Sequence, residues 1–170
     1  MELSEKKSKV KAWLTENNHF ILGIAARNLG LSDLDVLEAL PEEMVSDVPV
    51  ADFFSLWSTL TTWERALFLA QSPAAIVEIE GQLPEGKMGH GLFNLHDHSC
   101  PLGGHLDVDK ITRISLVAKN LDGNDSLGIH FFTGNGATGF AVYAGRGEER
   151  KILPAVRESF KSLWKKYARV

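Results

Sequence analysis

The sequence predicts an α+β fold, in which an N-terminal helical bundle packs on a large antiparallel β-sheet and a C-terminal helix closes the structure. Apolar residues recur at helical spacing early in the chain, short alternating runs separated by turns follow, and the tail again has helical spacing. A chain of 170 residues with 44% hydrophobic residues has the length of one domain with an ordinary core. We expect one domain over 1–170, with a helical part at about 1–64, a sheet part at about 65–150 and a closing helix at about 154–168.

Three apolar stripes in the first 45 residues predict three helices. The stripes consist of Val10, Trp13 and Leu14, then Ile21, Leu22, Ile24, Ala25 and Leu29, then Leu34, Leu37 and Leu40. Gly30 stands where the second helix should stop, and Pro41 ends the third. Ser32 opens a Ser-Asp-Leu-Asp sequence that resembles a capping box, which predicts where the third helix begins.

The second and third helices have the spacing of a helix-turn-helix. A recognition helix directs its first residues at bases and phosphates, and here those residues are Ser32, Asp33 and Asp35. Carboxylates repel a polyanion, and a net charge of -4 with a pI of about 5.9 gives no basic surface for nucleic acid or an anionic membrane. We therefore expect no nucleic-acid partner and a small helical subdomain that packs on the sheet.

From about residue 66 the apolar pattern changes to short alternating runs, after a short helix predicted within 48–64. The predicted strands are 67–70, 75–79, 88–96, 111–119, 126–133 and 138–143. The last two flank Gly134-Asn135-Gly136, a turn of the kind that joins antiparallel strands. Pro154 suits the first position of the closing helix, whose apolar residues share one face.

The termini and the cysteine content predict a cytoplasmic protein. The N-terminal residues are charged throughout and do not resemble a signal peptide, and no run of about 18 apolar residues predicts a membrane span. The single cysteine cannot form an internal disulfide, so a reducing compartment is expected. Of the isolated histidines, His19 is predicted to lie at an exposed helix start and His130 within the sheet.

The stretch 88–105 is the most distinctive part of the sequence, because it contains four of the 6 histidines and the only cysteine. These residues are His90, His96, His98, His105 and Cys100. If residues 88–96 form one strand, His90, Leu92 and His96 share a face, and Phe93 and Leu95 point to the core. Imidazole and thiolate bind soft and borderline metals and haem iron, so we expect a ligand here.

Three chemistries compete for this stretch. A zinc site could use His96, His98 and Cys100, but the spacing lacks the paired ligands of structural zinc sites. Nucleophilic catalysis by Cys100 with a histidine base lacks any sign of a strand-to-helix elbow or an oxyanion hole. Haem needs an axial ligand, an apolar face and cations for its propionates, and the first two could come from His90, Leu92, His96, His105 and Cys100. The candidate cations are Arg113, Arg146 and Lys119.

Several sequence blocks, taken in order, resemble a known family. They are Ala39 to Val45, Gly91 to Leu95, Gly104 to Leu106, Ile114 to Lys119, Phe131-Phe132, Phe140 to Tyr143, Gly145-Arg146 and Glu149 to Pro154. From about residue 21 to the C-terminus, the chain resembles the HutX/ChuX family of bacterial intracellular haem-utilisation proteins, which are relatives of half of a HemS-type protein. The resemblance implies N-terminal helices on a large antiparallel sheet.

The resemblance also implies a function. It implies a homodimer that binds b-type haem reversibly in the cytoplasm and passes it to a haem-degrading or storage partner, and it implies a carrier without enzymatic activity. Two alternatives remain open: a haem-degrading enzyme of the HemS type, and a dimeric interaction or regulatory module that has lost haem binding.

The chain departs from the family at Leu92, where members often have a tyrosine that can ligate ferric haem. Leucine cannot bind iron, so any axial ligand has to come from elsewhere. His105 matches the family's Gly-His motif and is the first candidate for the iron ligand. His90 and His96 come next, and His98 or Cys100 could substitute.

Overall fold

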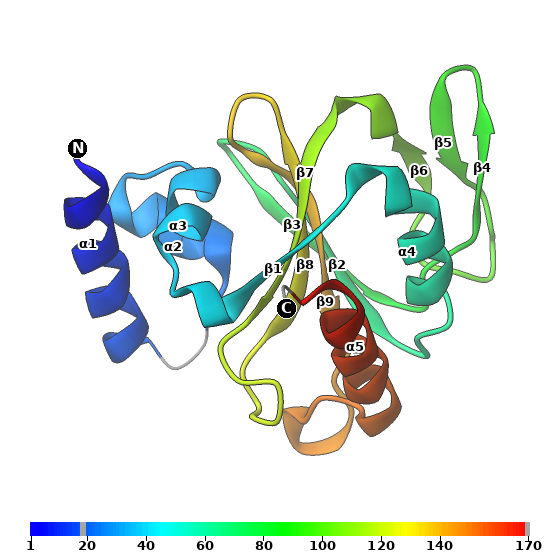
Figure 1. The fold of residues 1–170 in the computed structure, drawn as a ribbon. Helices are drawn as coiled ribbons and strands as arrows, with labels where there is room; N and C mark the ends of the chain where they lie inside the picture. Colours follow the sequence, from blue (N-terminus) through cyan, green and yellow to red (C-terminus); the bar gives the residue numbers. More distant parts are fainter. Residues whose placement is uncertain (18–19, 169–170) are drawn as a thin grey trace.

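The computed structural model describes residues 1–17 and 20–168, and the prediction for His19 lies outside them. Two sheets and five α-helices make up the described part of the chain. Figure 1 shows α1–α3 as a lobe at one end, while α4 and α5 cover one face of the larger sheet. None of the helices in the described ranges is long and apolar enough to cross a bilayer.

The N-terminal lobe consists of α1 (Leu3–Glu16), α2 (Leu22–Leu29) and α3 (Asp33–Ala39). Gly30 ends α2 with a φ of 65°, a left-handed conformation that glycine adopts without strain. The predicted capping box is confirmed, because the Ser32 hydroxyl accepts a hydrogen bond from the Asp35 amide and the Asp35 carboxylate accepts one from the Ser32 amide. The helices bury their apolar faces together and against Val117 and Phe132 of the larger sheet.

The larger sheet has six antiparallel strands in the order β1-β7-β8-β9-β2-β3. Its strands are β1 (Val45–Val48), β2 (Ala66–Gln71), β3 (Ile76–Gly81), β7 (Ile111–Ala118), β8 (Leu127–Thr133) and β9 (Thr138–Ala144). The predicted large antiparallel sheet is therefore confirmed. The expectation of a helical part that reaches residue 64 is wrong at β1, because this segment alternates in burial and pairs with β7 at the sheet edge.

The main core lies between the larger sheet and the helices α4 (Phe53–Leu60) and α5 (Pro154–Tyr167). Pro154 occupies the start of α5, as predicted, because its missing N–H costs nothing there. The rings of Phe131 and Phe140 stack with centroids 4.4 Å apart, and Phe53 meets Phe131 edge to face. The indole of Trp57 donates a hydrogen bond to the Pro84 carbonyl at 2.9 Å, which ties α4 to the loop before the smaller sheet.

The smaller sheet consists of β4 (Gly86–Gly89), β5 (Leu92–Leu95) and β6 (Gly104–Leu106). It corrects the prediction of a single strand over 88–96. His90 and Gly91 have φ values of 53° and 76°, and two adjacent residues with positive φ form the tight turn of a two-residue hairpin. His90 therefore sits in the turn and does not share a strand face with His96. Phe93 and Leu95 are buried, which confirms that they point to the core.

His130 is a buried histidine of β8, as predicted, with 2% of its surface exposed. Its ring packs edge to face against Tyr143 at a centroid distance of 5.5 Å. Because burial removes water from the charged form, the pKa of His130 falls from 6.5 to about 3. Between about pH 3 and pH 6.5, the folded protein therefore keeps this ring neutral, whereas the unfolded chain protonates it.

We expect His130 to make the protein less stable in mild acid. The free energy of unfolding should be independent of this group above its unfolded pKa and should fall by about 2 kcal/mol as the pH drops from about 6.5 to about 5. Urea unfolding at both pH values measures the change. His130→Leu removes the titrating group and should show a weaker pH dependence, and an equal dependence in both proteins would contradict this assignment.

Candidate functional site

The outer face of the smaller sheet brings together two of the predicted histidines. His105 of β6 lies opposite Asn94 of β5, and His96 directly follows β5. The imidazole rings of His96 and His105 are 5.2 Å apart between centroids and nearly perpendicular. The Nδ1 atom of His105 is 2.6 Å from the Asn94 side-chain oxygen. We call this group of Asn94, His96 and His105 the histidine face.

An apolar pocket of about 450 Å³ adjoins the histidine face, and His105 lines it. The pocket lies between the smaller sheet and strands of the larger sheet, and its apolar walls come from Phe68, Ala70, Leu95, Leu102, Leu106, Ile111, Phe131 and Phe140. The polar residues among its lining are His105, Asp107, Lys110 and Thr133. Pockets of this size, mostly apolar with a few polar groups, are typical of cofactor sites.

These residues meet the chemical requirements of haem. The pocket has aromatic and aliphatic walls for the porphyrin, and Lys110 among its lining residues is a cation for a propionate. The His105 imidazole, a donor for the iron, lies beside the pocket on the outer face of the smaller sheet, where it pairs with Asn94. Lys110 was not among the predicted cations. It lies in a short 3-10 helix (Val108–Lys110) between the histidine stretch and β7. The sequence signal that could have pointed to Lys110 is its position shortly after the Gly-His-Leu block of β6.

His98 and Cys100 lie in the loop between β5 and β6, whose side-chain contacts centre on Asp97. The Asp97 carboxylate accepts hydrogen bonds from the amide and hydroxyl of Ser99 at 2.9 and 2.6 Å, and these bonds lower the pKa of Asp97. The Cys100 thiol lies 3.7 Å from the same carboxylate. Across residues 1–17 and 20–168, no group of three or more His, Cys, Asp and Glu side chains is placed to hold a metal ion.

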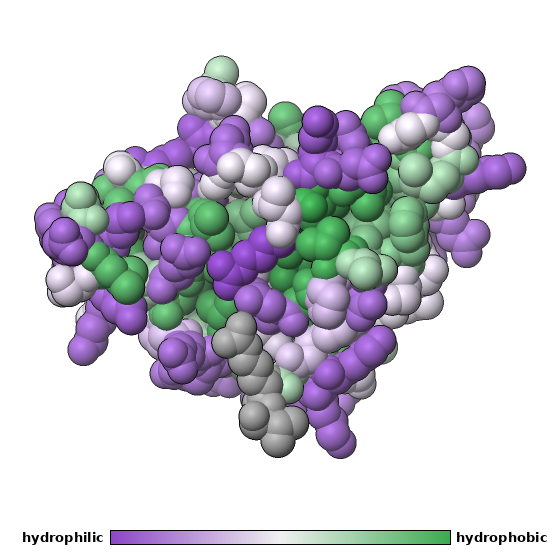
Figure 2. All heavy atoms as spheres, turned by 45° about the horizontal axis from the view of Figure 1, so that its top comes forward, coloured by the Kyte–Doolittle hydropathy of each residue, from purple (hydrophilic) through white to green (hydrophobic). Residues whose placement is uncertain are grey.

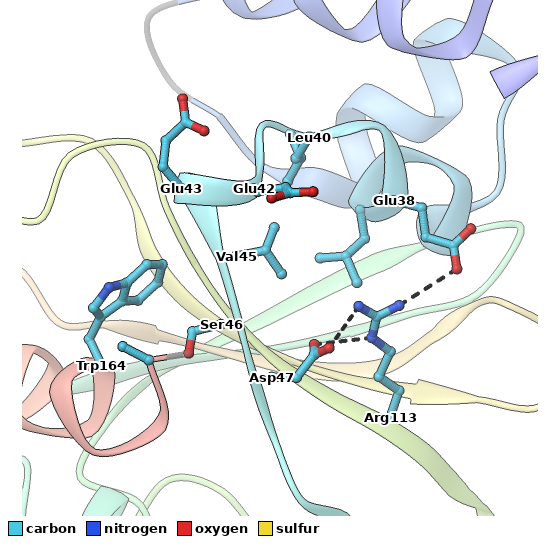
Figure 3. Close-up of a pocket in the computed structure, with 11 residues that line it drawn as sticks. Glu38, Leu40, Glu42, Glu43, Val45, Ser46, Asp47, Arg113 and Trp164 are labelled. Carbon is cyan, nitrogen blue, oxygen red and sulfur yellow. Dashed lines mark hydrogen bonds and ion pairs between the residues drawn. The ribbon is translucent and has the colours of Figure 1, made fainter. Parts of the chain in front are cut away.

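The structure does not bring Arg113 to the histidine face. Arg113 forms two hydrogen bonds with the Asp47 carboxylate, at 3.1 and 3.0 Å, and an ion pair with Glu38 at 3.6 Å (Figure 3). Ser115, two residues further along β7, also donates to Asp47, whereas Ile114 points into the core under α4 and α5. The guanidinium thus lies on the sheet face that the apolar pocket does not use.

The cavity around Arg113 is also unsuited to an anionic group. It measures about 600 Å³, and its charged lining is Glu38, Glu42, Glu43, Asp47 and Arg113. Figure 3 shows Glu43, Glu42 and Glu38 along the upper side of the cavity and Asp47 below them, beside Arg113. Four carboxylates against one guanidinium repel the propionates of haem. Of the two cavities, the apolar pocket is therefore the one whose lining fits haem.

The other two predicted cations have structural partners. Arg146 donates hydrogen bonds to the backbone carbonyls of Asn124 and Arg150 at 3.0 and 2.8 Å, which hold two loops together. Lys119 donates to the Leu14 carbonyl of α1 at 3.4 Å. Among the predicted site residues, His105 and His96 come together beside the apolar pocket, and the two arginines lie elsewhere.

The fold and the site define an α+β protein with a small sheet that carries a histidine beside an apolar pocket. The family model described as haem utilisation ChuX/HutX matches residues 46–163, so the chain belongs to this family. The intracellular heme transport protein HutX of Vibrio cholerae is 32% identical over 153 residues, which cover 89% of this chain and 79% of that protein.

Two solved structures are similar to this chain. The heme-binding protein ChuX matches with a TM-score of 0.77 and 27% identity, over 94% of this chain and 99% of ChuX. The heme-binding protein PhuS from Pseudomonas aeruginosa, in its holo form, matches with a TM-score of 0.74 and 14% identity, over 92% of this chain and 45% of PhuS. The second match shows the fold alone, and it confirms that this chain resembles about half of a longer protein.

Proposed function

We propose that this protein is a cytoplasmic haem carrier, which binds b-type haem reversibly and passes it to a haem-degrading or storage protein. The observation that carries the proposal is that His105, whose ring is held by Asn94, borders an apolar pocket in a chain of the ChuX/HutX family. The name of the Vibrio relative, which describes intracellular heme transport, supports a carrier and gives no support to an enzyme.

His105 is the proposed axial ligand, and Leu92 cannot replace it because leucine has no donor atom. The Nε2 atom of His105 has no hydrogen-bond partner within the described residues, whereas Nδ1 is hydrogen-bonded to the side-chain oxygen of Asn94. Lys110 is the proposed partner of a propionate, because it is the cation that lines the pocket. When bound, haem would supply iron as the site of ligation, and the chain would supply the imidazole and the apolar walls.

A homodimer is part of the proposal, and an exposed apolar area beside the smaller sheet supports it. Phe54 and Met88 are 47% and 46% exposed. The Phe54 ring contacts Phe93 at a centroid distance of 5.5 Å, and Met88 pairs with Phe93 across the hairpin, so both adjoin the same strand. Figure 2 shows apolar side chains gathered to the right of centre on this side of the molecule. Such patches are characteristic of association surfaces.

The proposal predicts stoichiometric haem binding. Titration of the purified protein with hemin should give a saturable change in the Soret band, with an end point near one haem per chain. A Soret change that never saturates would contradict the carrier function. Ascorbate added to the complex in the presence of catalase should leave the haem intact, and conversion to an open tetrapyrrole would instead identify a haem-degrading enzyme.

A further inference from the structure

The side-chain amide of Asn94 is held in one orientation by the backbone of its own hairpin. Its nitrogen lies 3.1 Å from the Lys87 carbonyl, 3.0 Å from the Gly89 carbonyl and 3.2 Å from the Leu92 carbonyl. A carbonyl oxygen can only accept a hydrogen bond, so the atom that faces these three groups has to be the NH₂ donor. The amide oxygen of Asn94 is thereby directed to the opposite side, toward His105.

This orientation determines which nitrogen of His105 carries the hydrogen. The Asn94 oxygen is an acceptor with no hydrogen of its own, and it lies 2.6 Å from the Nδ1 atom of His105. Nδ1 has to be the donor in this contact. In a neutral imidazole one nitrogen is protonated and the other carries a free lone pair, so Nε2 of His105 is the basic atom.

We propose that Asn94 is a positioning residue, which selects the Nδ1–H tautomer of His105 and so presents Nε2 to the haem iron. The inference rests on the proposed function as a haem carrier. Outer hydrogen bonds of this kind orient a ligating histidine and raise its basicity. Asn94 and His105 are directly paired across β5 and β6, so the smaller sheet itself sets the distance between them.

The same contact distinguishes His105 from its neighbour. His96 meets the ring of His105 edge to face, and within residues 1–17 and 20–168 no hydrogen bond orients the His96 imidazole. A side chain without such a bond has to lose rotational freedom when it binds iron. His105 has already lost that freedom, which makes it the better prepared ligand of the pair.

The tautomer can be measured without haem. Nitrogen and carbon NMR shifts of the His105 ring, recorded on the haem-free protein at a pH where the ring is neutral, should report the Nδ1–H form. Asn94→Leu should raise the population of the Nε2–H form. A wild-type ring that is mainly Nε2–H would overturn the inference, whether or not the protein binds haem.

Hemin affinity gives the second readout. Asn94→Leu should weaken hemin binding about tenfold, in the range seen when the hydrogen-bond partner of a metal-ligating side chain is removed. Asn28→Leu, which changes an exposed asparagine of α2, should bind hemin like the wild type. Equal affinities for wild type and Asn94→Leu would overturn the inference.

The two readouts separate this inference from the proposed function. If the wild type fails to bind hemin, the carrier function fails, and the tautomer measured on the haem-free protein still decides the role of Asn94. Because Asn94→Leu removes three hydrogen bonds of the hairpin, its fold should be checked by circular dichroism. The wild-type tautomer decides the matter if this variant does not fold.

Discussion

His105→Ala is expected to weaken hemin binding by at least about 100-fold, more than the loss of the hydrogen-bond partner of a ligand costs. The physical reason is that this imidazole, beside the apolar pocket, is the proposed axial ligand, and alanine offers no atom to the iron. Absorbance titration with hemin measures the effect. The variant should also lose the Soret position that is characteristic of histidine ligation, while its apolar pocket retains weak binding to the porphyrin.

Two other histidines provide matched controls for His105→Ala. His98→Ala changes an exposed residue of the loop between β5 and β6 and should leave hemin affinity unchanged. His96→Ala changes the neighbouring ring and should have a smaller effect than His105→Ala, because its contact with His105 is edge to face. If His96→Ala abolished binding while His105→Ala bound normally, His96 would replace His105 as the axial ligand.

Phe131→Ala is expected to destabilise the protein by about 3–5 kcal/mol, the usual cost of removing a buried aromatic ring. Phe131 is 1% exposed, stacks on Phe140 and lines the apolar pocket, so the change enlarges a cavity and removes part of the pocket wall. Urea unfolding of the haem-free protein measures the free energy. The same variant should bind hemin more weakly, because the porphyrin loses an aromatic contact.

Phe54→Ala is the control for the core substitution. Phe54 is 47% exposed on α4, so its removal leaves no closed cavity and should cost about 1 kcal/mol or less. A loss of less than about 1 kcal/mol for Phe131→Ala would show that Phe131 does not belong to the cooperative core.

If Phe54→Ala shifted the protein from dimer to monomer in light scattering, that result would support the apolar area as the dimer contact.

Local patterns in the sequence predicted most of the elements correctly. The capping box at Ser32, the stop at Gly30 and the start of α5 at Pro154 depend on neighbouring residues, and all three are as expected. The prediction of one strand over 88–96 failed, because alternation of apolar residues continues across the tight turn at His90-Gly91. β1 was missed because a strand of four residues carries little periodicity.

The candidate site needed information that no local pattern contains. The sequence alone determined that histidines are concentrated in residues 88–105 and that Leu92 has no donor atom. Tertiary structure decided that His105 and His96 meet, that Asn94 orients His105, and that Lys110 lines the pocket. It also placed Arg113 against Asp47, away from the pocket. These relations depend on strand pairing and on which sheet face a side chain occupies, and residues distant in sequence set both.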